Sequence, residues 1–410
     1  MHGPGAALKQ VLALGFTQTV AWASSTYLPA ILAPFIAGDL ELSRSSVFGA
    51  FSVSLVVMAL AGPAVGRAID RGRGVLALSN LVLACGLVML GFASGAPMLF
   101  GAWCVLGVGM AMGLYDAAFA TLVRLHGGAA REPITGITLI AGFASTVGWP
   151  LTAYLAEHFG WRASCFVWAA MHLCVALPLN LRCVPSIARA APLPAAPDVD
   201  AASEGAVQRA SRRHRHAFAL LALFAAATAF VTSAMAAHLP GLLVAAGAGA
   251  TAALTAAALL GPAQVVARLL EFMAARRMGY HPLVSARLAT ALHPAGALLL
   301  GVFGGLPWVA SGFALLHGAG NGMITIARGT LPLAIFGPDG YGLRQGLLSV
   351  LARAMQAAAP FVFGLVLDIY GVSAALALSA GLSLIALAAL MGLRRERESG
   401  DPAGTMRDSG

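Results

Sequence analysis

The chain has 410 residues, of which 59% are hydrophobic and only 10% are charged, and its mean hydropathy is +0.83. An ordinary soluble domain carries roughly 25% charged residues, so this composition excludes a water-soluble fold. The net charge of +9 does not predict nucleic-acid binding, because the basic residues are spread over many short loops and do not gather on one soluble face. The five cysteines show no metal-ligand spacing, so neither a zinc site nor a disulfide framework is expected.

Twelve apolar stretches follow one another along the chain. A bilayer core of about 30 Å needs about 20 helical residues, and nearly every stretch meets that length. The predicted spans are 11–35, 45–66, 74–94, 97–124, 133–156, 163–182, 216–246, 252–275, 282–303, 308–335, 344–369 and 373–393. The sequence therefore predicts an all-α membrane protein with 12 transmembrane helices.

The longest connection, 183–215, contains four prolines, then acidic residues and then several arginines, which is typical of a cytoplasmic linker. It divides the chain into four parts. The predicted parts are an N-terminal six-helix bundle (1–182), the linker (183–215), a C-terminal six-helix bundle (216–393) and a cytoplasmic tail (394–410).

Basic residues occupy alternate loops, and Lys and Arg are retained on the cytoplasmic side during membrane insertion. Outside the linker, those assigned to that side are Lys9, Arg67, Arg71, Arg73, Arg131, Arg276, Arg277, Arg287, Arg344, Arg394, Arg395 and Arg397. Only Arg44 and Arg162 fall on the opposite side. We therefore expect a multi-pass protein of the inner (plasma) membrane, surrounded by lipid, with both termini cytoplasmic, and we expect a monomer.

An internal repeat relates the two predicted bundles. At an offset close to 211 residues, Gly107 falls on Gly318, Gly109 falls on Gly320, and Pro150 meets Pro360 after a small slip. This repeat predicts two pseudo-symmetric bundles, an arrangement that suits alternating access to a site between them.

The loop between the second and third spans reads Gly66-Arg67-Ala68-Ile69-Asp70-Arg71-Gly72-Arg73. It resembles the G-x-x-x-D-R-x-G-R signature of the major facilitator superfamily (MFS), although the second Gly-Arg pair arrives one residue early. Arg131-Glu132-x-x-x-Gly136 is similar to the family's second cytoplasmic signature. A generic charged turn is the alternative interpretation of the first loop.

The resemblance extends over nearly the whole chain. It implies the MFS fold, with helices 1, 4, 7 and 10 lining a central cavity, and secondary active transport of a small solute driven by an ion or solute gradient. It implies no cofactor. The overall sequence pattern is more like that of the monocarboxylate-transporter branch, although the acidic-Gly-Gly-Trp motif with which helix 1 begins in that branch is missing.

Three charged residues lie deep in the predicted spans. A charge at the centre of a membrane helix costs roughly 2.5–3.5 kcal/mol on insertion scales, so it usually faces a partner or a wet cavity. Asp116 in helix 4 and Arg328 in helix 10 lie at matching depths, and Arg353 in helix 11 can reach them. One hypothesis is that the two arginines hold an organic anion while Asp116 pairs with one of them in the empty site and takes up a proton. The alternative is a permanent structural ion pair.

Further candidates for substrate contact are Gln18, Trp22 and Tyr27 in helix 1 and Asn321 and Thr325 in helix 10. Asn321 and Thr325 share one helix face with Arg328. The residues predicted to latch one conformation are Gly66, Asp70, Arg71, Arg131, Arg268 and Glu271. Within this set, Arg268 and Glu271 are predicted to form an i, i+3 pair in helix 8.

Two other functions stay open at this point. A copper or other metal transporter is suggested by Met235, His238, His317 and Met323, because thioether and imidazole groups suit soft metals, although methionine also commonly fills gaps between helices. A receptor that keeps the fold without transporting is the other. An enzyme is not expected, because the sequence contains no nucleophile-base motif, H-E-x-x-H motif or phosphate-binding loop.

Overall fold

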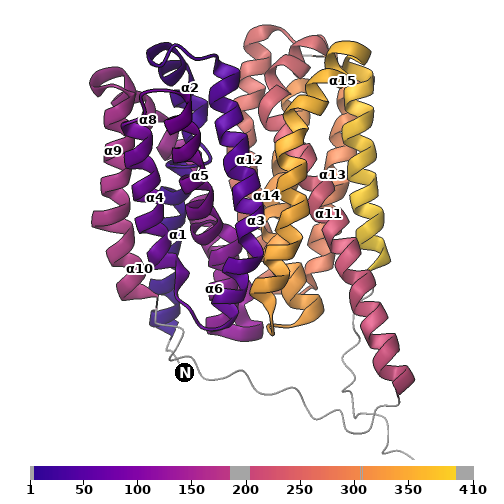
Figure 1. Ribbon diagram of the computed structural model, residues 1–410. Helices are drawn as coiled ribbons and strands as arrows, with labels where there is room; N and C mark the ends of the chain where they lie inside the picture. Colours follow the sequence, from indigo (N-terminus) through magenta and orange to yellow (C-terminus); the bar gives the residue numbers. More distant parts are fainter. Residues whose placement is uncertain (1–3, 185–203, 305, 307, 394–410) are drawn as a thin grey trace, which may run out of the picture.

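The structure is a computed structural model that describes residues 4–184, 204–304, 306 and 308–393. The described residues form helices, turns and short connections (Figure 1), and no strand occurs among them, so the predicted all-α fold is confirmed. The predicted tail 394–410 and the middle of the predicted linker lie outside the described residues.

Most of the continuous spans predicted for the first half are interrupted in the structure. Four of the six spans consist of two helical pieces. The pieces are α1 (Pro4–Ala23) with α2 (Leu28–Asp39), α5 (Ala96–Gly113) with α6 (Tyr115–His126), α7 (Arg131–Ala141) with α8 (Ala144–Phe159), and α9 (Trp161–Met171) with α10 (Leu177–Cys183). The unbroken spans are α3 (Arg44–Asp70) and α4 (Val75–Gly91); η1 (Gly127–Ala130) precedes α7, and the π-helical turn η2 (His172–Ala176) joins α9 to α10.

Helices of the second half are longer and more continuous. They are α11 (Glu204–Ala245), α12 (Ala250–Met278), α13 (Pro282–Phe303), α14 (Val309–Phe336) and α15 (Tyr341–Gly392). The last of these covers both the eleventh and the twelfth predicted span, and the two are separated by a turn at Gly371, whose φ of 79° suits glycine. The helices are therefore consistent with twelve spans.

Each half has its own apolar core. Trp103 and Leu83 are fully buried in the first half, and Phe313 and Phe363 are almost fully buried in the second. Large apolar side chains such as Leu60 and Phe361 are 73% and 76% exposed on the outside of the bundles. In a bilayer these side chains face lipid, so the exposure is expected for a membrane protein.

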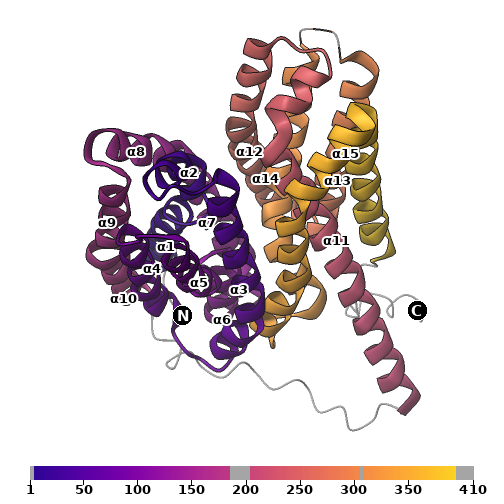
Figure 2. The same ribbon diagram turned by 45° about the horizontal axis from the view of Figure 1, so that its top comes forward.

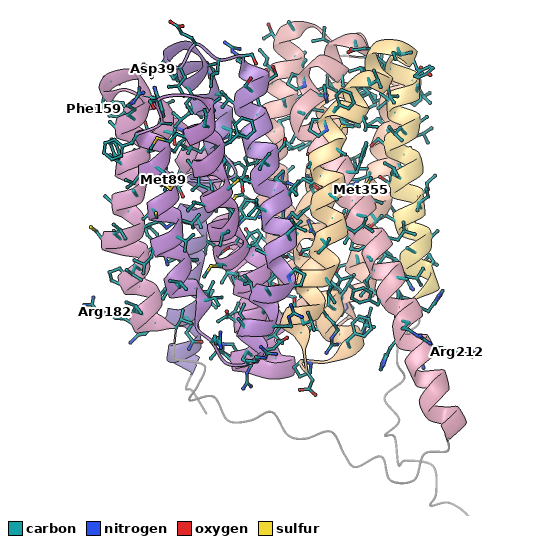
Figure 3. The ribbon with its side chains drawn as sticks, viewed as in Figure 1. Asp39, Met89, Phe159, Arg182, Arg212 and Met355 are labelled. Carbon is teal, nitrogen blue, oxygen red and sulfur yellow. The ribbon has the colours of Figure 1, made fainter. Side chains whose placement is uncertain are left out.

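One end of the bundle, which we call the basic end, carries Arg67 in the last turn of α3, Arg71 and Arg73 just after it, and Arg276 and Arg277 in the last turn of α12. Arg182 and Arg212 also lie at this end, and Asp39 and Phe159 lie at the opposite end (Figure 3). Figure 2 shows that the two halves diverge toward the opposite end. The pieces near the basic end, α6 and α7, pack against α12, α14 and α15, whereas α2, α5 and α8 pack within their own half.

Backbone atoms meet where α3 of the first half crosses α15 of the second. A Cβ atom added to Gly346 would lie 2.6 Å from the carbonyl oxygen of Gly62, and one added to Gly66 would overlap the carbonyl group of Gly342. Glycine is required at this crossing because any side chain would push the helices apart. The two halves are therefore closed against each other at the basic end.

Candidate functional site

Breaks in the helices of the first half set the geometry of the site. A break leaves backbone groups without helical partners, and these groups and their neighbours can face a cavity. At the break between α5 and α6, Leu114 has an extended conformation, and the Nε2 atom of Gln18 donates to the freed carbonyl of Gly113 at 2.6 Å. Gln18, predicted to contact a substrate, thus supports the break.

The same break places Asp116 in the first turn of α6, where the helix dipole favours a carboxylate. Its Oδ1 atom accepts a hydrogen bond from Gln345 at 2.9 Å, and its Oδ2 atom accepts one from Ser349 at 2.8 Å. Oδ2 also lies 3.2 Å from Nη2 of Arg353. All three partners belong to α15, so this carboxylate cluster connects the two halves.

Arg353 and Arg328 lie on the second-half side of the carboxylate cluster. The Arg353 side chain is 6% exposed, and its Nη1 atom donates to Gln356 at 2.7 Å. Arg328 is close enough for Asp116 and Arg353 both to act on its charge, and it lines a small pocket with Gln345 and Ser349. Among the described residues no ion pair includes Arg328. The structure therefore brings the three predicted charges together, with Asp116 paired to Arg353.

A second cluster, which we call the aromatic cluster, lies around the break between α1 and α2. The ring of Trp22 is 4.9 Å from that of Tyr115 and 5.9 Å from that of Tyr27, and Tyr27 contacts Trp149 at 5.8 Å. The buried indole Nε1 of Trp22 has no hydrogen-bond partner within the part of the chain that the structure describes. Trp22 and Tyr27 were predicted as candidates for substrate contact, and the structure places them side by side.

Arg268 of α12 reaches the aromatic cluster from the other half. It is 5% exposed, and its charge acts on both Tyr27 and Tyr115. Its Nη1 atom donates to the Thr138 carbonyl at 2.9 Å, next to the break between α7 and α8. Its other acceptors are the carbonyl of Gly322 at 3.2 Å, Oε1 of Gln264 at 3.3 Å and Oγ1 of Thr325 at 3.3 Å. Every one of these acceptors is neutral.

The predicted pairing of Arg268 with Glu271 is wrong. Oε1 of Glu271 instead lies 3.4 Å from Nη2 of Arg131, which belongs to the other half. The physical reason is that α12 packs against α7, so both side chains cross the interface, and Arg268 takes the backbone acceptor at the α7 break. Both residues connect the halves, as predicted latch residues would, but with different partners.

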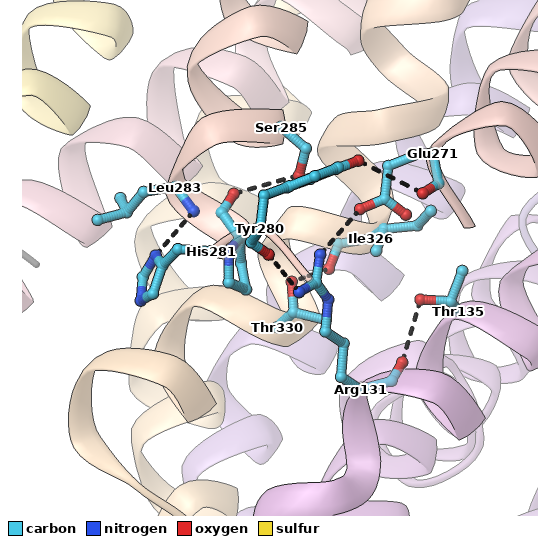
Figure 4. Close-up of polar contacts among 10 residues, drawn as sticks. Arg131, Thr135, Glu271, Tyr280, His281, Leu283, Ser285, Ile326 and Thr330 are labelled. Atoms are coloured by element: carbon cyan, nitrogen blue, oxygen red, sulfur yellow. Dashed lines mark hydrogen bonds and ion pairs between the residues drawn. The ribbon is translucent and has the colours of Figure 1, made fainter. Parts of the chain in front are cut away.

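Figure 4 shows the contacts of Arg131 at the basic end. Besides meeting Glu271, its Nη1 atom donates to the carbonyl of Tyr280 at 2.7 Å, and its guanidinium lies 5.5 Å from the centre of that tyrosine ring. The Tyr280 hydroxyl donates to the Glu271 carbonyl at 3.4 Å. Burial, and then the Glu271 charge, raise the pKa of Tyr280, which keeps this hydroxyl a donor. An exposed pair, Arg276 and Glu132, crosses the interface nearby at 3.3 Å.

The predicted glycine-aspartate latch also lies at the closed interface. Oδ1 and Oδ2 of Asp70 accept hydrogen bonds from the backbone N–H groups of Gly342 and Leu343, each at 2.8 Å, at the start of α15. A carboxylate is stabilised there by the helix dipole. Arg71, predicted to join this latch, is exposed on the loop.

The remaining predicted residues, Asn321 and Thr325, have partners within the second half. Oδ1 of Asn321 accepts from Thr232 at 2.5 Å, and Thr325 donates to the Asn321 carbonyl at 2.9 Å while accepting from Arg268. Sequence reasoning missed Gln345, Ser349, Tyr115 and Trp149. The first two could have been found, because they precede Arg353 by eight and four residues and so share its helix face.

The four residues that suggested a metal transporter do not gather at one place. Met235 belongs to the apolar core of the second half, and Met323 packs against a different core cluster. His238 is 2.8 Å from the Pro360 carbonyl, and His317 stacks on His293 with ring centres 4.5 Å apart. Across the described ranges, no group of three or more His, Cys, Asp or Glu side chains could hold a metal ion.

Comparisons with known proteins give consistent results. Residues 14–326 match the family model described as the Major Facilitator Superfamily. An uncharacterized 38 kDa protein in the 23S RNA operon of Thermoproteus tenax is 28% identical over 367 residues, covering 89% of this chain and 90% of the relative.

Similar solved structures include three transporters. The human organic anion transporter MFSD10 (TETRAN) is 18% identical with a TM-score of 0.67, covering 95% of this chain and 100% of that one. The proton:xylose symporter XylE, bound to 6-bromo-6-deoxy-D-glucose, is 12% identical with a TM-score of 0.71 and coverages of 94% and 95%. FucP in the outward conformation is 14% identical with a TM-score of 0.63 and coverages of 94% and 99%. At these identities the similarity concerns the fold.

Proposed function

Since the chain belongs to the major facilitator superfamily and is a secondary transporter of that fold, we propose that its substrate is a small organic anion bound between the two halves at Arg268. The observation that carries this proposal is the charge balance of the buried centre. Arg353 is paired with Asp116, and Arg131 with Glu271. Among the described residues, Arg328 is in no ion pair but is half-buried and lies near the Asp116 carboxylate, whereas Arg268 is buried and is bonded to neutral acceptors.

A buried guanidinium with neutral partners attracts a carboxylate. Arginine offers several N–H donors in a planar fork, which matches the two oxygens of a carboxylate. The unpartnered indole N–H of Trp22 and the hydroxyls of Tyr27 and Tyr115 add donors around the same guanidinium, and their rings supply an apolar wall. This combination favours an anion with a compact apolar body over a sugar or a cation.

The carboxylate cluster has a different role in the proposal. Asp116 bonds three side chains of α15, so the halves cannot separate at the basic end while these bonds hold. Protonation of Asp116, or binding of the anion near Arg353 and Arg328, would weaken this connection. A proton is therefore the proposed coupling ion.

We further propose that the basic end faces the cytoplasm of a cell with this protein in its plasma membrane. Loops rich in Lys and Arg stay on the cytoplasmic side, and most of the described basic residues outside the bundle centre lie at one end, Arg162 beside Asp39 being an exception. With the halves closed at this end and diverging at the other, the conformation would be open to the outside. The proposed working form is a monomer, since each half buries its own core.

The direct test is uptake by proteoliposomes of radiolabelled monocarboxylates and dicarboxylates, a neutral sugar and copper, with and without a pH gradient. We expect proton-dependent uptake of a carboxylate, and we expect Arg268→Lys to raise its KM strongly because lysine cannot form the planar fork. Arg277→Lys, at an exposed position of the same helix, is the matched control and should transport normally. Uptake of the sugar or copper alone, or unchanged KM in Arg268→Lys, would refute the anion proposal.

A further inference from the structure

The sixth span contains a polar residue that the transport site does not explain. His172 is fully buried at the first residue of the π-helical turn η2, where the N–H of Leu177 bonds to the carbonyl of His172 five residues earlier. A π-helical turn is a rare interruption that often marks a functional position. The ring of this histidine connects its own span to two other spans of the first half.

Both ring nitrogens of His172 have partners. Nδ1 lies 2.9 Å from Oδ1 of Asn80 on α4, and Nε2 lies 2.8 Å from Oγ of Ser24, the first residue after α1. Asn80 donates through Nδ2 to the Leu76 carbonyl at 2.9 Å, so its Oδ1 atom must act as an acceptor. Nδ1 of His172 therefore carries the proton, and in the neutral ring Nε2 accepts a hydrogen bond from the Ser24 hydroxyl, whose other acceptor is the Ala21 carbonyl at 3.4 Å.

Ser24 lies within the break that separates α1 from α2. Trp22 precedes it by two residues and Tyr27 follows it by three, and both rings belong to the aromatic cluster beside Arg268. The turn itself is closed by few backbone bonds, including Tyr27 N–H to the Trp22 carbonyl at 3.1 Å. A side-chain bond from outside the turn is therefore well placed to fix its conformation.

We propose that His172 is a positioning residue that holds the break of the first span, and so keeps Trp22 and Tyr27 oriented toward Arg268. Asn80 fixes the orientation and tautomer of the ring, and the ring in turn fixes Ser24. In an apolar bundle interior, a three-residue polar chain with every ring nitrogen satisfied gives a single arrangement of the three spans. The proposal rests on the proposed function only in treating the aromatic cluster as the binding site.

Two substitutions separate this role from a general packing role. The amide of Asn at position 172 occupies the place of Nδ1, so His172→Asn keeps the bond to Asn80 and loses the bond to Ser24. The longer His172→Gln places its amide near Nε2, so it keeps Ser24 and loses Asn80. Ser24→Ala removes only the hydroxyl and leaves the ring in place.

The test needs no substrate. In a full-length protein whose five native cysteines are replaced by serine or alanine, Thr26→Cys places a half-buried thiol within the break. Its rate of reaction with a membrane-impermeant maleimide, in proteoliposomes, reports how well the break is held. We expect at least a roughly fivefold faster reaction in His172→Asn and in Ser24→Ala, and a rate close to that of the parent in His172→Gln. The double variant Ser24→Ala/His172→Asn should react no faster than either single variant.

Thermal unfolding of the same proteins is the control, because His172→Asn and His172→Gln each lose one bond and should unfold at similar temperatures. Faster reaction in His172→Gln than in His172→Asn, or an unchanged rate in Ser24→Ala, would overturn the proposal. If neither variant at position 172 folds, the rate in Ser24→Ala decides alone. The result does not depend on which solute is transported, so it can fail while the anion proposal stands.

Discussion

The carboxylate cluster, and Arg268 beside the aromatic cluster, each join the two halves at the protein centre, yet their charge balance differs. Asp116 neutralises Arg353 and bonds two further side chains of α15. Arg268 meets only carbonyl, amide and hydroxyl oxygens. A buried charge that already has its counter-ion is suited to holding two surfaces together. A buried charge without one is suited to receiving a counter-ion from outside.

The largest expected effect comes from removing the counter-ion of the first cluster. Asp116→Ala leaves Arg353 buried and unpaired, and breaking a buried pair in this way costs about 3–5 kcal/mol. The temperature of thermal unfolding in detergent should therefore fall markedly, and net transport should be lost. The double variant Asp116→Asn/Arg353→Gln, which removes both charges, should recover most of the stability. A double variant as unstable as Asp116→Ala would show that an unpaired Arg353 is not the cause of the lost stability.

A smaller effect on stability, and a large one on binding, is expected in the second cluster. Arg268→Gln removes a charge that has no partner to strand, so the unfolding temperature should change little. Loss of a charge-assisted hydrogen bond costs about 1.5–3 kcal/mol, which corresponds to roughly a tenfold to hundredfold rise in KM. Parallel measurement of unfolding temperature and KM in Arg268→Gln and Asp116→Ala tests the contrast. Equal loss of stability in the two variants would contradict it.

The closed crossing of α3 and α15 supports both clusters without charge. A Cβ at position 346 would lie 2.6–2.8 Å from backbone atoms of Gly62 and Pro63, so Gly346→Ala must push the helices apart. Overpacking of this kind costs about 1–3 kcal/mol. We expect the variant to favour the form open at the basic end, as measured by faster alkylation of a cysteine at position 349 in place of serine. Gly261→Ala, where an added Cβ meets open space, is the control.

The smallest effect is expected for the exposed pair of Arg276 and Glu132. Their side chains are 60% and 63% exposed, and exposed ion pairs contribute about 0–1 kcal/mol. Arg276→Gln should leave the unfolding temperature and KM within error, whereas Arg131→Gln strands Glu271, which is 2% exposed, and should lower stability. Similar behaviour of the two variants would mean that burial does not distinguish these bridges.

Hydropathy and charge alone predicted much of this molecule. The spans, their number and the expectation that Asp116 pairs with Arg328 or Arg353 follow from length, depth and the high cost of an unpaired membrane charge; that Arg353 is the partner did not follow. The role of Arg268 did not follow, because its partner is a backbone carbonyl at a helix break. Breaks such as those at Leu114 and Gly142 do not change the hydropathy of the apolar sequence, so nothing in the pattern marks which backbone carbonyl accepts a side-chain donor there.

The contacts of Tyr115 and His172 could not be predicted from the sequence for the same reason. Tyr115 follows a break, and its contact with Trp22 depends on how α6 restarts. The bonds of His172 depend on the π-helical turn, which has no composition of its own. Side chains on regular helices could be assigned to a face from spacing, whereas those next to irregular turns could not.

The bond of Asp116 to α15 also has a kinetic consequence. Every return of the empty protein must break three side-chain bonds across the halves, with no substrate charge to replace the lost ion pair. In the proposed cycle, a loaded protein carries an anion that can approach Arg353 and Arg328 as Asp116 leaves. Exchange of labelled for unlabelled substrate across the membrane should therefore run faster than net accumulation, and the slow step of the cycle should be the reorientation of the empty carrier.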